Sequence, residues 1–482
     1  MPCPSSCPPG LLALMAPGLA LMATFSLSSQ AGDRRALPVE KPPGVKGRTL
    51  ILLDVNTKSP VRIISENFLS LQLDPSIIHD GWLDFLSTLA AGLALFSFPF
   101  AVDIVRSDIA LDKQKGCKIA QHPDIMLELQ REKAAQMHLV LLKEQFSNTY
   151  SNLTLTARSL DKLYNFADCS GLHLIFALNA LRRNPNNSWN SSNALSLLKY
   201  SASKKYNISW ELGNEPNNYR TLIGRSVNGS QLGKDYIQLR SLLQLIRTYS
   251  RANLYGPNIG RPRKNVIALL EGGGVLGQHY YIDGRVAKVT DFLKTRLLDT
   301  LSDQIRKIQK VVSTYAPGKK IWLEGVGATS AGGMNNLSDS YAAGFLWLNT
   351  LGLLASQGID VVVRHSFLDH GHNHLVDQNF NPLPDYWLSL LYKRLIGPKV
   401  LAIHVAGLQR KPRPGRVIRD KLRIYAHCTS YHNHNYVRGS ITLYIINLHR
   451  SRKKIKLAGT LRDKIVHQYL LQPYGKDGLH SK

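Results

Sequence analysis

Short runs of β-branched and other apolar residues alternate with longer amphipathic segments along most of the chain. Seven runs end near Gly, Asn or Asp and are typical of strands: Thr49–Asp54, Leu69–Leu73, Leu172–Leu178, Ile208–Leu212, Leu254–Gly256, Lys320–Leu323 and Gly358–Phe367. The helical patterns between them include Asp124–Phe146, Leu232–Arg251 and Phe292–Tyr315. This alternation predicts parallel βαβ units, and their number favours a closed (β/α)8, or TIM, barrel over an open sheet.

The pattern changes after about Val400. Four further runs alternate with turns and have no long helices between them: Leu401–Val405, Leu422–His427, Ile441–Leu448 and Lys464–Leu471. Such a series predicts an appended β-sandwich domain, although four strands would make a thin one.

One segment departs from both patterns. Phe85–Val102 runs for 18 residues without a charge, which is about the minimum length of a membrane span. It contains Gly92, Pro99 and two serines, and it lies where a barrel needs a strand. We therefore expect a buried helix or an anomalous segment here, and no transmembrane anchor.

The start of the chain resembles a secretory leader. Leu11–Phe25 is apolar and Ser26–Ala31 is small and polar, so residues 1–31 are predicted to be a signal peptide, with a disordered leader as the alternative. Six Asn-x-Ser/Thr triplets that can accept a glycan follow, at Asn152, Asn186, Asn190, Asn207, Asn228 and Asn336. Together they predict a secreted glycoprotein of the extracellular space and matrix.

The charge of the chain is strongly unbalanced. It has 60 Lys and Arg against 33 Asp and Glu, a net charge of +27. Such a surface attracts polyanions in general. Because the leader and the acceptor triplets indicate secretion, a sulfated extracellular glycan is a better expectation than nucleic acid.

Candidate chemistry lies at the ends of two predicted strands. Asn214 and Glu215 directly follow Ile208–Leu212, which places them at the functional end of a barrel. Retaining glycoside hydrolysis needs one carboxyl group as acid and a second, ~5 Å away, as nucleophile. Glu215 fits the acid, Asn214 can hydrogen-bond a sugar 2-hydroxyl, and Glu324 is the candidate second carboxylate. The alternatives are a surface Glu215 beside a turn and a structural Glu324.

Four longer runs resemble one known family. They are Trp210–Asn217 (Trp-Glu-Leu-Gly-Asn-Glu-Pro-Asn), Asn228–Gly233, Leu254–Lys264 and His374–Trp387. The chain resembles the heparanases, endo-β-glucuronidases of glycoside hydrolase family 79, and within them a branch regarded as inactive. Matching runs cover most of Thr49–Lys482.

The resemblance implies a domain plan. It predicts a TIM-barrel domain over residues 67–399 and a β-sandwich over residues 400–482, with residues 49–66 joining the sandwich. It also implies a Cys117–Cys169 disulfide, which leaves Cys428 single. Against the family pattern, Phe85–Val102 and Glu271–Gly277 are short and the end at Lys482 omits strands. We therefore expect an incomplete barrel and a truncated sandwich, as in an isoform or a faulty gene model.

The order of two residues decides the expected activity. Active heparanases have Trp-Leu-Gly-Glu at the later strand, with the nucleophile fourth, whereas this chain has Trp-Leu-Glu-Gly. Gly325 thus occupies the nucleophile position and Glu324 precedes it. Because side chains alternate along a strand, Glu324 is predicted to point away from the sugar unless a bulge restores its direction. The chain is therefore predicted to retain an acid but not to cleave.

Other residues are expected to contact the sugar because they match positions in the family. These are Asp74, Arg261, Arg263, Lys264, Tyr280, Arg285, Gly332 and Gly371. Arg261 replaces a family Gln and Asn373 a family Tyr. The basic clusters Arg410–Arg423 and Arg450–Lys456 are not explained by the resemblance and are either solvated surface or sulfate-binding.

The leading hypothesis is a secreted heparan sulfate- and heparin-binding protein that lacks heparanase activity and inhibits active heparanase by occupying its substrate. It requires no cofactor and no metal. Its expected partners are heparan sulfate proteoglycans, heparin and active heparanase. The alternatives are an active endo-β-glucuronidase that uses Glu215 and Glu324, and a nucleic-acid-binding protein suggested by charge alone.

Overall fold

The described part of the chain lies within its second structural unit. The computed structural model divides into residues 1–49 and residues 50–482. It describes residues 50–73, 99–102, 110–112, 154–220, 224–260, 276–282, 287–329, 333–368, 372–377, 381–406, 421–473, 475 and 477–482. Every statement below concerns these residues.

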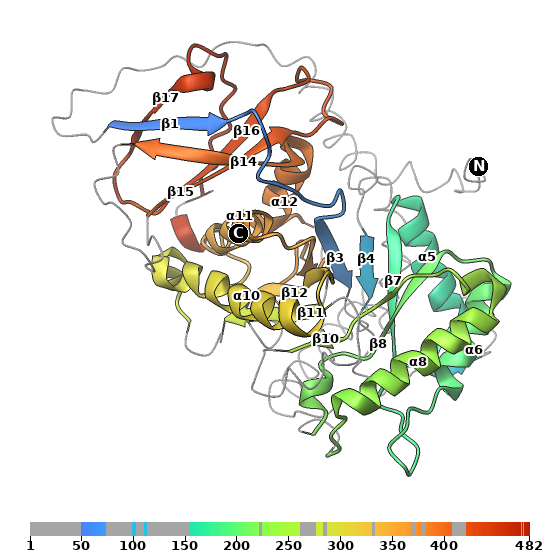
Figure 1. Cartoon of the computed structure of the whole chain (residues 1–482). Coiled ribbons are helices and arrows are strands. Elements are labelled where there is room, and N and C mark those ends of the chain that lie inside the picture. The colour runs from blue at the N-terminus through green and yellow to red at the C-terminus, as the bar shows by residue number, and fades with distance from the viewer. Residues whose placement is uncertain are drawn as a thin grey trace, which may run out of the picture. The chain divides into compact units, whose positions relative to one another are not determined.

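A parallel sheet forms the centre of this unit (Figure 1). Its order is β10-β11-β12-β13-β3-β4-β7-β8-β9. The strands are β3 (Leu69–Leu73), β4 (Pro99–Val102), β7 (His173–Leu178), β8 (Ile208–Leu212), β9 (Leu254–Tyr255), β10 (Asn258–Ile259), β11 (Leu276–Ile282), β12 (Ile321–Thr329) and β13 (Val361–His365). The two ends of the sheet, β9 and β10, are separated in the chain by Gly256 and Pro257 alone. We count β9 and β10 together as one strand position, so the nine strands follow the order of an eight-membered TIM-like barrel.

The second barrel strand along the chain, after β3, comes from an unexpected segment. Strand β4 is the end of the uncharged run Phe85–Val102, and it pairs in parallel with both β3 and β7. Phe100 of β4 lies opposite Leu71 on one side and Leu174 on the other. The described end of the run is therefore a strand, not the buried helix that we considered. A short uncharged stretch suits this position because barrel strands are buried on both faces.

Helices cover the outside of the sheet (Figure 1). They are α5 (Ala157–Cys169), α6 (Ser192–Ser203), α8 (Gly229–Leu245), α10 (Thr295–Tyr315), α11 (Ala343–Gln357) and α12 (Pro384–Leu395). In α10, Leu298, Leu301, Ile305, Ile308 and Val312 recur at helical spacing and are buried. Short 3-10 helices are η1 (Pro216–Asn218), η2 (Arg247–Tyr249), η3 (Val289–Leu293), η4 (Gly459–Leu461) and η5 (Gly478–His480), and β5 (Ala110–Asp112) pairs with β6 (Thr154–Thr156).

Alternation along the strands separates two layers of core. Leu71, Phe176, Trp210 and Leu323 belong to a large cluster with residues of the covering helices. A separate cluster joins Ile175, Trp322, Val361 and Val363, which come from β7, β12 and β13, and Tyr255 of β9 packs on it. The Tyr255 and Trp322 rings lie 4.5 Å apart. Because these residues come from strands far apart in the sheet order, we assign the second cluster to the barrel interior.

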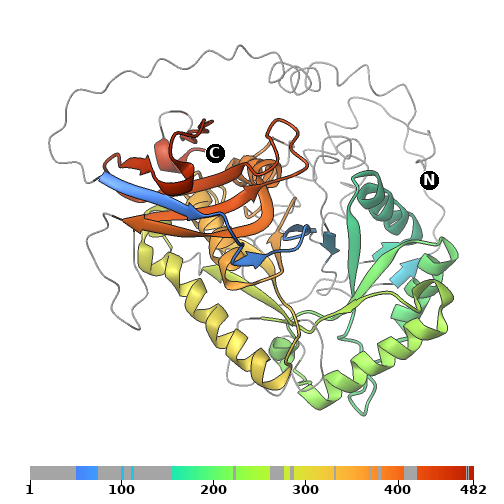
Figure 2. The same ribbon diagram turned by 45° about the horizontal axis from the view of Figure 1, so that its top comes forward.

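A second sheet has the order β16-β15-β14-β1-β17, with β2 also paired to β14. Its strands are β1 (Leu50–Asn56), β2 (Arg62–Ile63), β14 (Ile396–Ala406), β15 (Leu422–Thr429), β16 (Ile441–Asn447) and β17 (Lys454–Leu457). Strand β1 runs antiparallel to β14 and parallel to β17, so the early and late parts of the chain share one sheet (Figure 2). A single such sheet is present in the described residues, and the sandwich stays a prediction.

One predicted strand of this region is wrong. Lys464–Leu471 forms no strand, and its apolar side chains are exposed, with Ile465 at 92% and Leu470 at 69%. The fifth strand of the sheet is instead β17, a short basic segment. Apolar alternation makes a strand possible, but a strand forms only where a partner edge accepts its hydrogen bonds.

Buried polar contacts join this sheet to the barrel helices. Arg423 of β15 donates to Asp299 Oδ1 of α10 over 2.6 Å and to Asn349 Oδ1 of α11 over 3.2 Å. The Tyr425 hydroxyl donates to the same Asn349 oxygen over 2.9 Å. The ring of Tyr425 also packs on Gly352, where an added Cβ would lie 2.5 Å from ring atoms. Arg423 is therefore part of the junction and not of an exposed basic cluster.

We expect Arg423→Ala to lower the free energy of unfolding by about 3–5 kcal/mol, because it leaves the Asp299 carboxylate buried without its charged partner. Urea unfolding followed by circular dichroism measures the change. The control is Arg452→Ala, which removes an exposed arginine. Equal stability of the two variants would contradict this account of the junction.

His427 of β15 should make stability depend on pH. Burial lowers its pKa from 6.5 to about 4, and its Nδ1 lies 3.0 Å from Gly397 O. The contribution of neutral His427 to the free energy of unfolding is complete above pH 6.5. It is lost as the pH falls toward 4, because His427 takes up a proton at higher pH in the unfolded chain than in the folded one. The loss is about 3 kcal/mol. We expect His427→Phe to reduce the fall in unfolding free energy between pH 7 and pH 4 by that amount, while His434→Phe at an exposed site should leave it unchanged.

Candidate functional site

The loop after β8 holds Glu215 at the C-terminal edge of the barrel sheet. Glu215 has a left-handed backbone, with φ 47° and ψ 52°. Its N–H donates to Asn258 O over 2.8 Å, and its carbonyl accepts from Asn218 N over 2.7 Å. These bonds fix the loop to the neighbouring strand β10. A left-handed non-glycine residue costs about 1–3 kcal/mol, and such strain is concentrated at functional sites.

The Glu215 carboxylate is oriented by its neighbours. Asn218 Nδ2 donates to Glu215 Oε2 over 2.7 Å. Gly260 packs against this hydrogen-bonded pair, where an added Cβ would lie 2.8 Å from the Glu215 carboxyl carbon and 2.9 Å from Asn218 Nδ2. The Gly260 N–H also donates to Asn217 Oδ1 over 3.0 Å. A partly exposed, positioned carboxyl group at a barrel mouth is suited to contact a sugar oxygen.

Two amide oxygens beside Glu215 are enclosed. Asn214 Oδ1 and Asn258 Oδ1 are buried and accept no hydrogen bond in the described part of the structure. A buried carbonyl oxygen without a donor costs about 1–3 kcal/mol.

A β-bulge interrupts β12 at Glu324 and Gly325. Leu323 lies opposite Gln278 of β11 and Val362 of β13, whereas Val326 lies opposite Tyr280 and Arg364. The neighbours advance two residues while β12 advances three, so β12 contains one extra residue. Gly325 has φ +60°, a conformation open to glycine at little cost.

The bulge determines where Glu324 points. Leu323 and Val326 both belong to the outer core, although residues three apart on a regular strand face opposite sides. Trp322 belongs to the interior cluster, so Glu324, two residues later, lies on the interior side and is 4% exposed. The sequence did not decide whether a bulge is present here, and the structure contains one. Gly325, which matches the family nucleophile, has no side chain.

A third carboxylate, Glu211, was missed by the sequence analysis. It lies on β8 between Trp210 and Leu212 of the outer core, so it faces the interior, and it is 3% exposed. Burial raises the pKa of Tyr236 well above its usual value, and the charges of Glu211 and Glu324 add to the rise. Both carboxylates therefore lie near Tyr236. The alternation in Ile-Ser-Trp-Glu-Leu places Ser209 and Glu211 on the face opposite Trp210, and this pattern could have indicated a carboxylate inside the barrel.

A buried network holds the ends of β12 and β13. Arg364 Nη2 donates to Asp385 Oδ2 over 2.8 Å, and Arg364 Nη1 donates to Asn373 O over 2.6 Å. Asn373 Nδ2 donates to Thr329 O over 2.6 Å, while Thr329 N donates to Asn373 Oδ1 over 3.4 Å. Asn373 is 1% exposed. Asn373 therefore ties its loop to β12. This is a structural role, whereas the Tyr expected at this position in the family would line the cleft.

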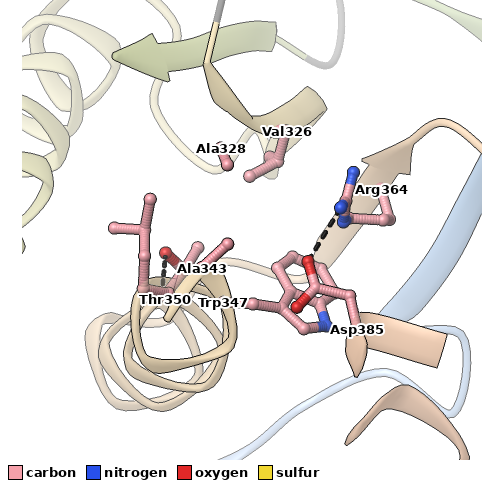
Figure 3. A pocket seen from close by; sticks show the side chains of 9 residues that line it. Val326, Ala328, Ala343, Trp347, Thr350, Arg364 and Asp385 are labelled. Atoms are coloured by element: carbon pink, nitrogen blue, oxygen red, sulfur yellow. Dashed lines mark hydrogen bonds and ion pairs between the residues drawn. The ribbon is translucent and has the colours of Figure 1, made fainter. Parts of the chain in front are cut away.

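A small cavity lies beside this network (Figure 3). Its volume is ≈ 10 Å³. Its lining includes Val326, Ala328, Ala343, Trp347, Thr350, Arg364 and Asp385. Burial raises the pKa of Asp385 and the Arg364 charge opposes the rise. The space is about that of one water molecule, so the cavity belongs to the packing and not to a sugar site.

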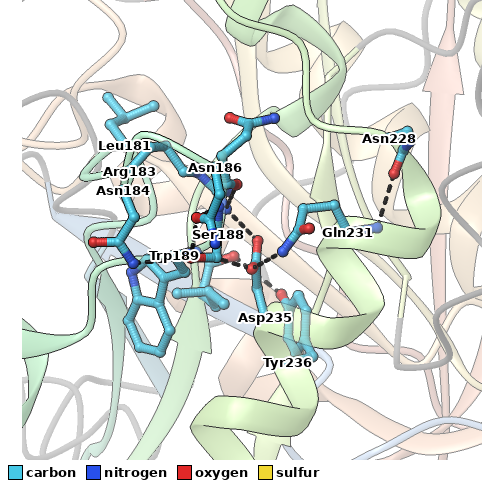
Figure 4. Close-up of polar contacts among 12 residues, drawn as sticks. Leu181, Arg183, Asn184, Asn186, Ser188, Trp189, Asn228, Gln231, Asp235 and Tyr236 are labelled. Carbon is cyan, nitrogen blue, oxygen red and sulfur yellow. Dashed lines mark hydrogen bonds and ion pairs between the residues drawn. The ribbon is translucent and has the colours of Figure 1, made fainter.

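The loop after β7 is anchored to α8 (Figure 4). Arg183 forms a buried ion pair with Asp235, which also accepts from Trp189 N over 3.2 Å and from Gln231 Nε2 over 2.8 Å. Asn228 caps the same helix by accepting from Gln231 N over 2.8 Å. The loops after β7 and β8 are thus both fixed to neighbouring elements, which gives this edge of the barrel firm walls.

Five predicted glycan acceptors are described. Asn186, Asn207, Asn228 and Asn336 are exposed, and Asn190 is half-buried. Their exposure allows modification without unfolding. The sixth acceptor, Asn152, lies outside the described residues.

Several predicted site residues cannot be placed. Outside the described residues lie the signal peptide and Asp74, Cys117, Arg261, Arg263, Lys264, Arg285, Gly332 and Gly371. For two others the structure gives the backbone position alone: Tyr280 lies in β11 opposite Val326, and Cys169 is the last residue of α5. Cys428 is a free thiol in the described part. The site that can be described thus consists of the Asn214–Glu215 loop and, three sheet positions away, Glu324 and Gly325.

Metal-binding clusters and membrane-spanning helices are absent from the described residues. They contain no group of three or more His, Cys, Asp or Glu arranged to hold a metal ion. They also contain no helix that is both long and apolar enough to cross a membrane.

A parallel barrel with an Asn-Glu pair at a strand end defines a protein of the glycoside hydrolase type, and comparisons agree. The fold is similar to a 4-O-α-L-rhamnosyl-β-D-glucuronidase from Fusarium oxysporum, with TM-score 0.52 and 12% identity over 78% of this chain and 84% of that one. It is also similar to a GH51 arabinofuranosidase from Xanthomonas axonopodis pv. citri, with TM-score 0.54 and 10% identity over 85% and 88%. Identities this low show the fold alone.

Sequence comparison is more specific. Residues 120–352 match the family described as glycosyl hydrolase family 79, N-terminal domain. A Homo sapiens protein named inactive heparanase-2 is 78% identical over all of this chain and 89% of its own length. Heparanase of Rattus norvegicus is 43% identical over 90% of this chain and 85% of its own length.

The chain belongs to the heparanase family, glycoside hydrolase family 79, which confirms the resemblance found in the sequence. Within the family, the chain is more similar to the protein named inactive heparanase-2 than to the heparanase of Rattus norvegicus.

We expect Asn373→Ala to lower the free energy of unfolding by about 2–3 kcal/mol, because Thr329 N and O would remain buried without their partner. The matched control is Asn335→Ala at an exposed site. Thermal unfolding of both variants measures the difference. If the two variants melt together, Asn373 does not tie its loop to β12.

Proposed function

We propose that this protein is secreted and binds heparan sulfate and heparin at its barrel mouth without cleaving them. The single observation that carries the proposal is the bulge in β12. It accommodates Gly325 at the position of the family nucleophile, while the loop that positions Glu215 is retained.

The chemistry of the site supports binding without hydrolysis. In a retaining mechanism a carboxylate must attack the anomeric carbon and form a glycosyl intermediate. Gly325 has no group to attack with, and Glu324 is only 4% exposed, so a sugar at the mouth has little access to it. Glu215 alone can donate a proton or accept a hydrogen bond, but it cannot form that intermediate.

Groups at the mouth are suited to hold a sugar. The half-buried Asn214 carries an amide group that can hydrogen-bond a sugar hydroxyl, and Glu215 is fixed beside it by Asn218. The expected sugar contacts Arg261, Arg263 and Lys264 follow Gly260 directly in the chain and would add charge for sulfate groups. The net charge of +27 attracts a polyanion over longer distances.

The proposed location is the extracellular space and matrix. The predicted signal peptide over residues 1–31 supports it, as do the exposed acceptors Asn186, Asn207, Asn228 and Asn336. Heparan sulfate proteoglycans are present there and are the proposed partners. By occupying the same chains, the protein would reduce the substrate available to active heparanase.

The test combines retention and cleavage. We expect the purified, glycosylated protein to be retained on immobilised heparin, to elute with rising salt and to leave heparan sulfate at its original length by gel filtration. Asn214→Ala should bind a heparan sulfate oligosaccharide about fivefold more weakly, because one hydrogen bond to the sugar is lost. Adding the protein to active heparanase should slow fragment release, and excess substrate should restore it.

The control variant is Asn165→Ala, which changes an exposed asparagine of the covering helix α5 and should bind like wild type. Fragments released by wild type and lost in Glu215→Gln would contradict the proposal. So would failure of the wild-type protein to bind heparin at all.

A further inference from the structure

The edge strand β17 and the turn before it form a basic surface that the barrel site does not include. Between Arg450 and Lys464 the chain has seven Lys and Arg residues and one Asp. β17 is the edge strand of the second sheet and lies beside β1, whereas β8 belongs to the barrel sheet (Figures 1 and 2). We call Arg450, Arg452, Lys454 and Lys456 the β17 surface.

Alternation places these charges together. Lys454 and Lys456 are exposed, whereas Ile455 and Leu457 between and after them are partly buried, and Leu457 packs on the sheet core. Residues two apart on a strand lie about 6.6 Å apart on the same face. The two ammonium groups therefore form a row along the strand, and an extended polymer can follow such a row.

The turn extends the row with arginines held outward. Asn447 Nδ2 donates to Ser451 O over 3.2 Å, and Asn447 Oδ1 accepts from His449 N over 3.1 Å, so one side chain braces the turn. Arg450 and Arg452 are exposed on it. Arginine can bind a sulfate or carboxylate with two parallel hydrogen bonds, so the braced turn presents specific anion-binding groups.

These charges are not used within the described structure. No acidic residue there forms an ion pair with any of the four side chains of the β17 surface. By contrast, Arg364 and Arg423 are buried and paired with Asp385 and Asp299. The chain thus contains structural arginines inside and unneutralised ones on this edge.

We propose that the β17 surface is a second binding site, separate from the barrel mouth, for a linear sulfated polysaccharide. The choice of a sulfated glycan rests on the proposed extracellular function. A chain held at two places dissociates more slowly than one held at a single place, because the second contact is made at high local concentration. The site would let the protein hold a long glycan while its mouth contacts one sugar unit.

A simpler role is possible for lysines on an edge strand, since charge there prevents strands of other molecules from pairing with it. The experiment must separate this role, and the effect of net charge, from a binding site. It uses the full chain with Arg450→Gln, Arg452→Gln, Lys454→Gln and Lys456→Gln combined. The matched control combines Arg247→Gln, Arg296→Gln, Lys307→Gln and Lys310→Gln, which removes the same four charges at exposed positions of η2 and α10.

Binding of a long heparin chain is measured by titration at physiological salt, with circular dichroism to verify folding. We expect the β17 variant to bind at least about tenfold more weakly, because each basic residue beside an anionic surface contributes roughly fivefold. The control variant should bind like wild type. Equal weakening in both variants, or none in either, would overturn the proposal, and so would a DNA duplex of equal charge that competes as well as heparin.

The two proposals fail in different ways. If wild type does not bind heparin, the proposed function fails. If wild type binds, Asn214→Ala weakens binding and the β17 variant does not, then the mouth is a site and the β17 surface is not.

Discussion

The two-residue period of side chains along β12 is the constraint on which the site depends. One extra residue at Glu324–Gly325 keeps Leu323 and Val326 both in the outer core and places Glu324 on the interior side. Without the bulge, either the packing after Leu323 or the register with β11 and β13 would change. Because Gly325 has a positive φ, the residue that allows the bulge is also the one expected at the nucleophile position, and it has no side chain. In the proposed function, the lack of an attacking group and the preserved packing of β12 depend on this one residue.

The opposite side of the site is fixed in a different way. Glu215 is positioned by hydrogen bonds from its loop to β10, and Asn218 orients its carboxylate. The loop after β7 is fixed by the buried Arg183–Asp235 pair. The mouth therefore retains an ordered wall with hydrogen-bonding groups, and this order is useful for binding even where no bond is broken.

The basic residues of the chain serve two physical purposes. Arg364 and Arg423 are buried, and each compensates a carboxylate while joining elements far apart in the sequence. The residues of the β17 surface are exposed and unpaired among the described residues, so their charge is available to a ligand. A net charge of +27 cannot distinguish these cases. In the proposed function the exposed charges bind the glycan, whereas the buried ones stabilise the fold.

The sequence by itself determined the family and the alternation of strands and helices, because these depend on local patterns and on matched motifs. It could not determine that Pro99–Val102 completes the sheet order, since strand pairing depends on neighbours that are distant in the chain. It predicted a strand at Lys464–Leu471, where apolar alternation found no partner edge, and it grouped Arg423 with surface charges because Asp299 lies 124 residues away. Only the tertiary structure decided the direction of Glu324, the burial of Glu211 and the role of Asn373. The reason is that a bulge, a burial or a long-range hydrogen bond is a relation between segments, and no single segment of the sequence specifies it.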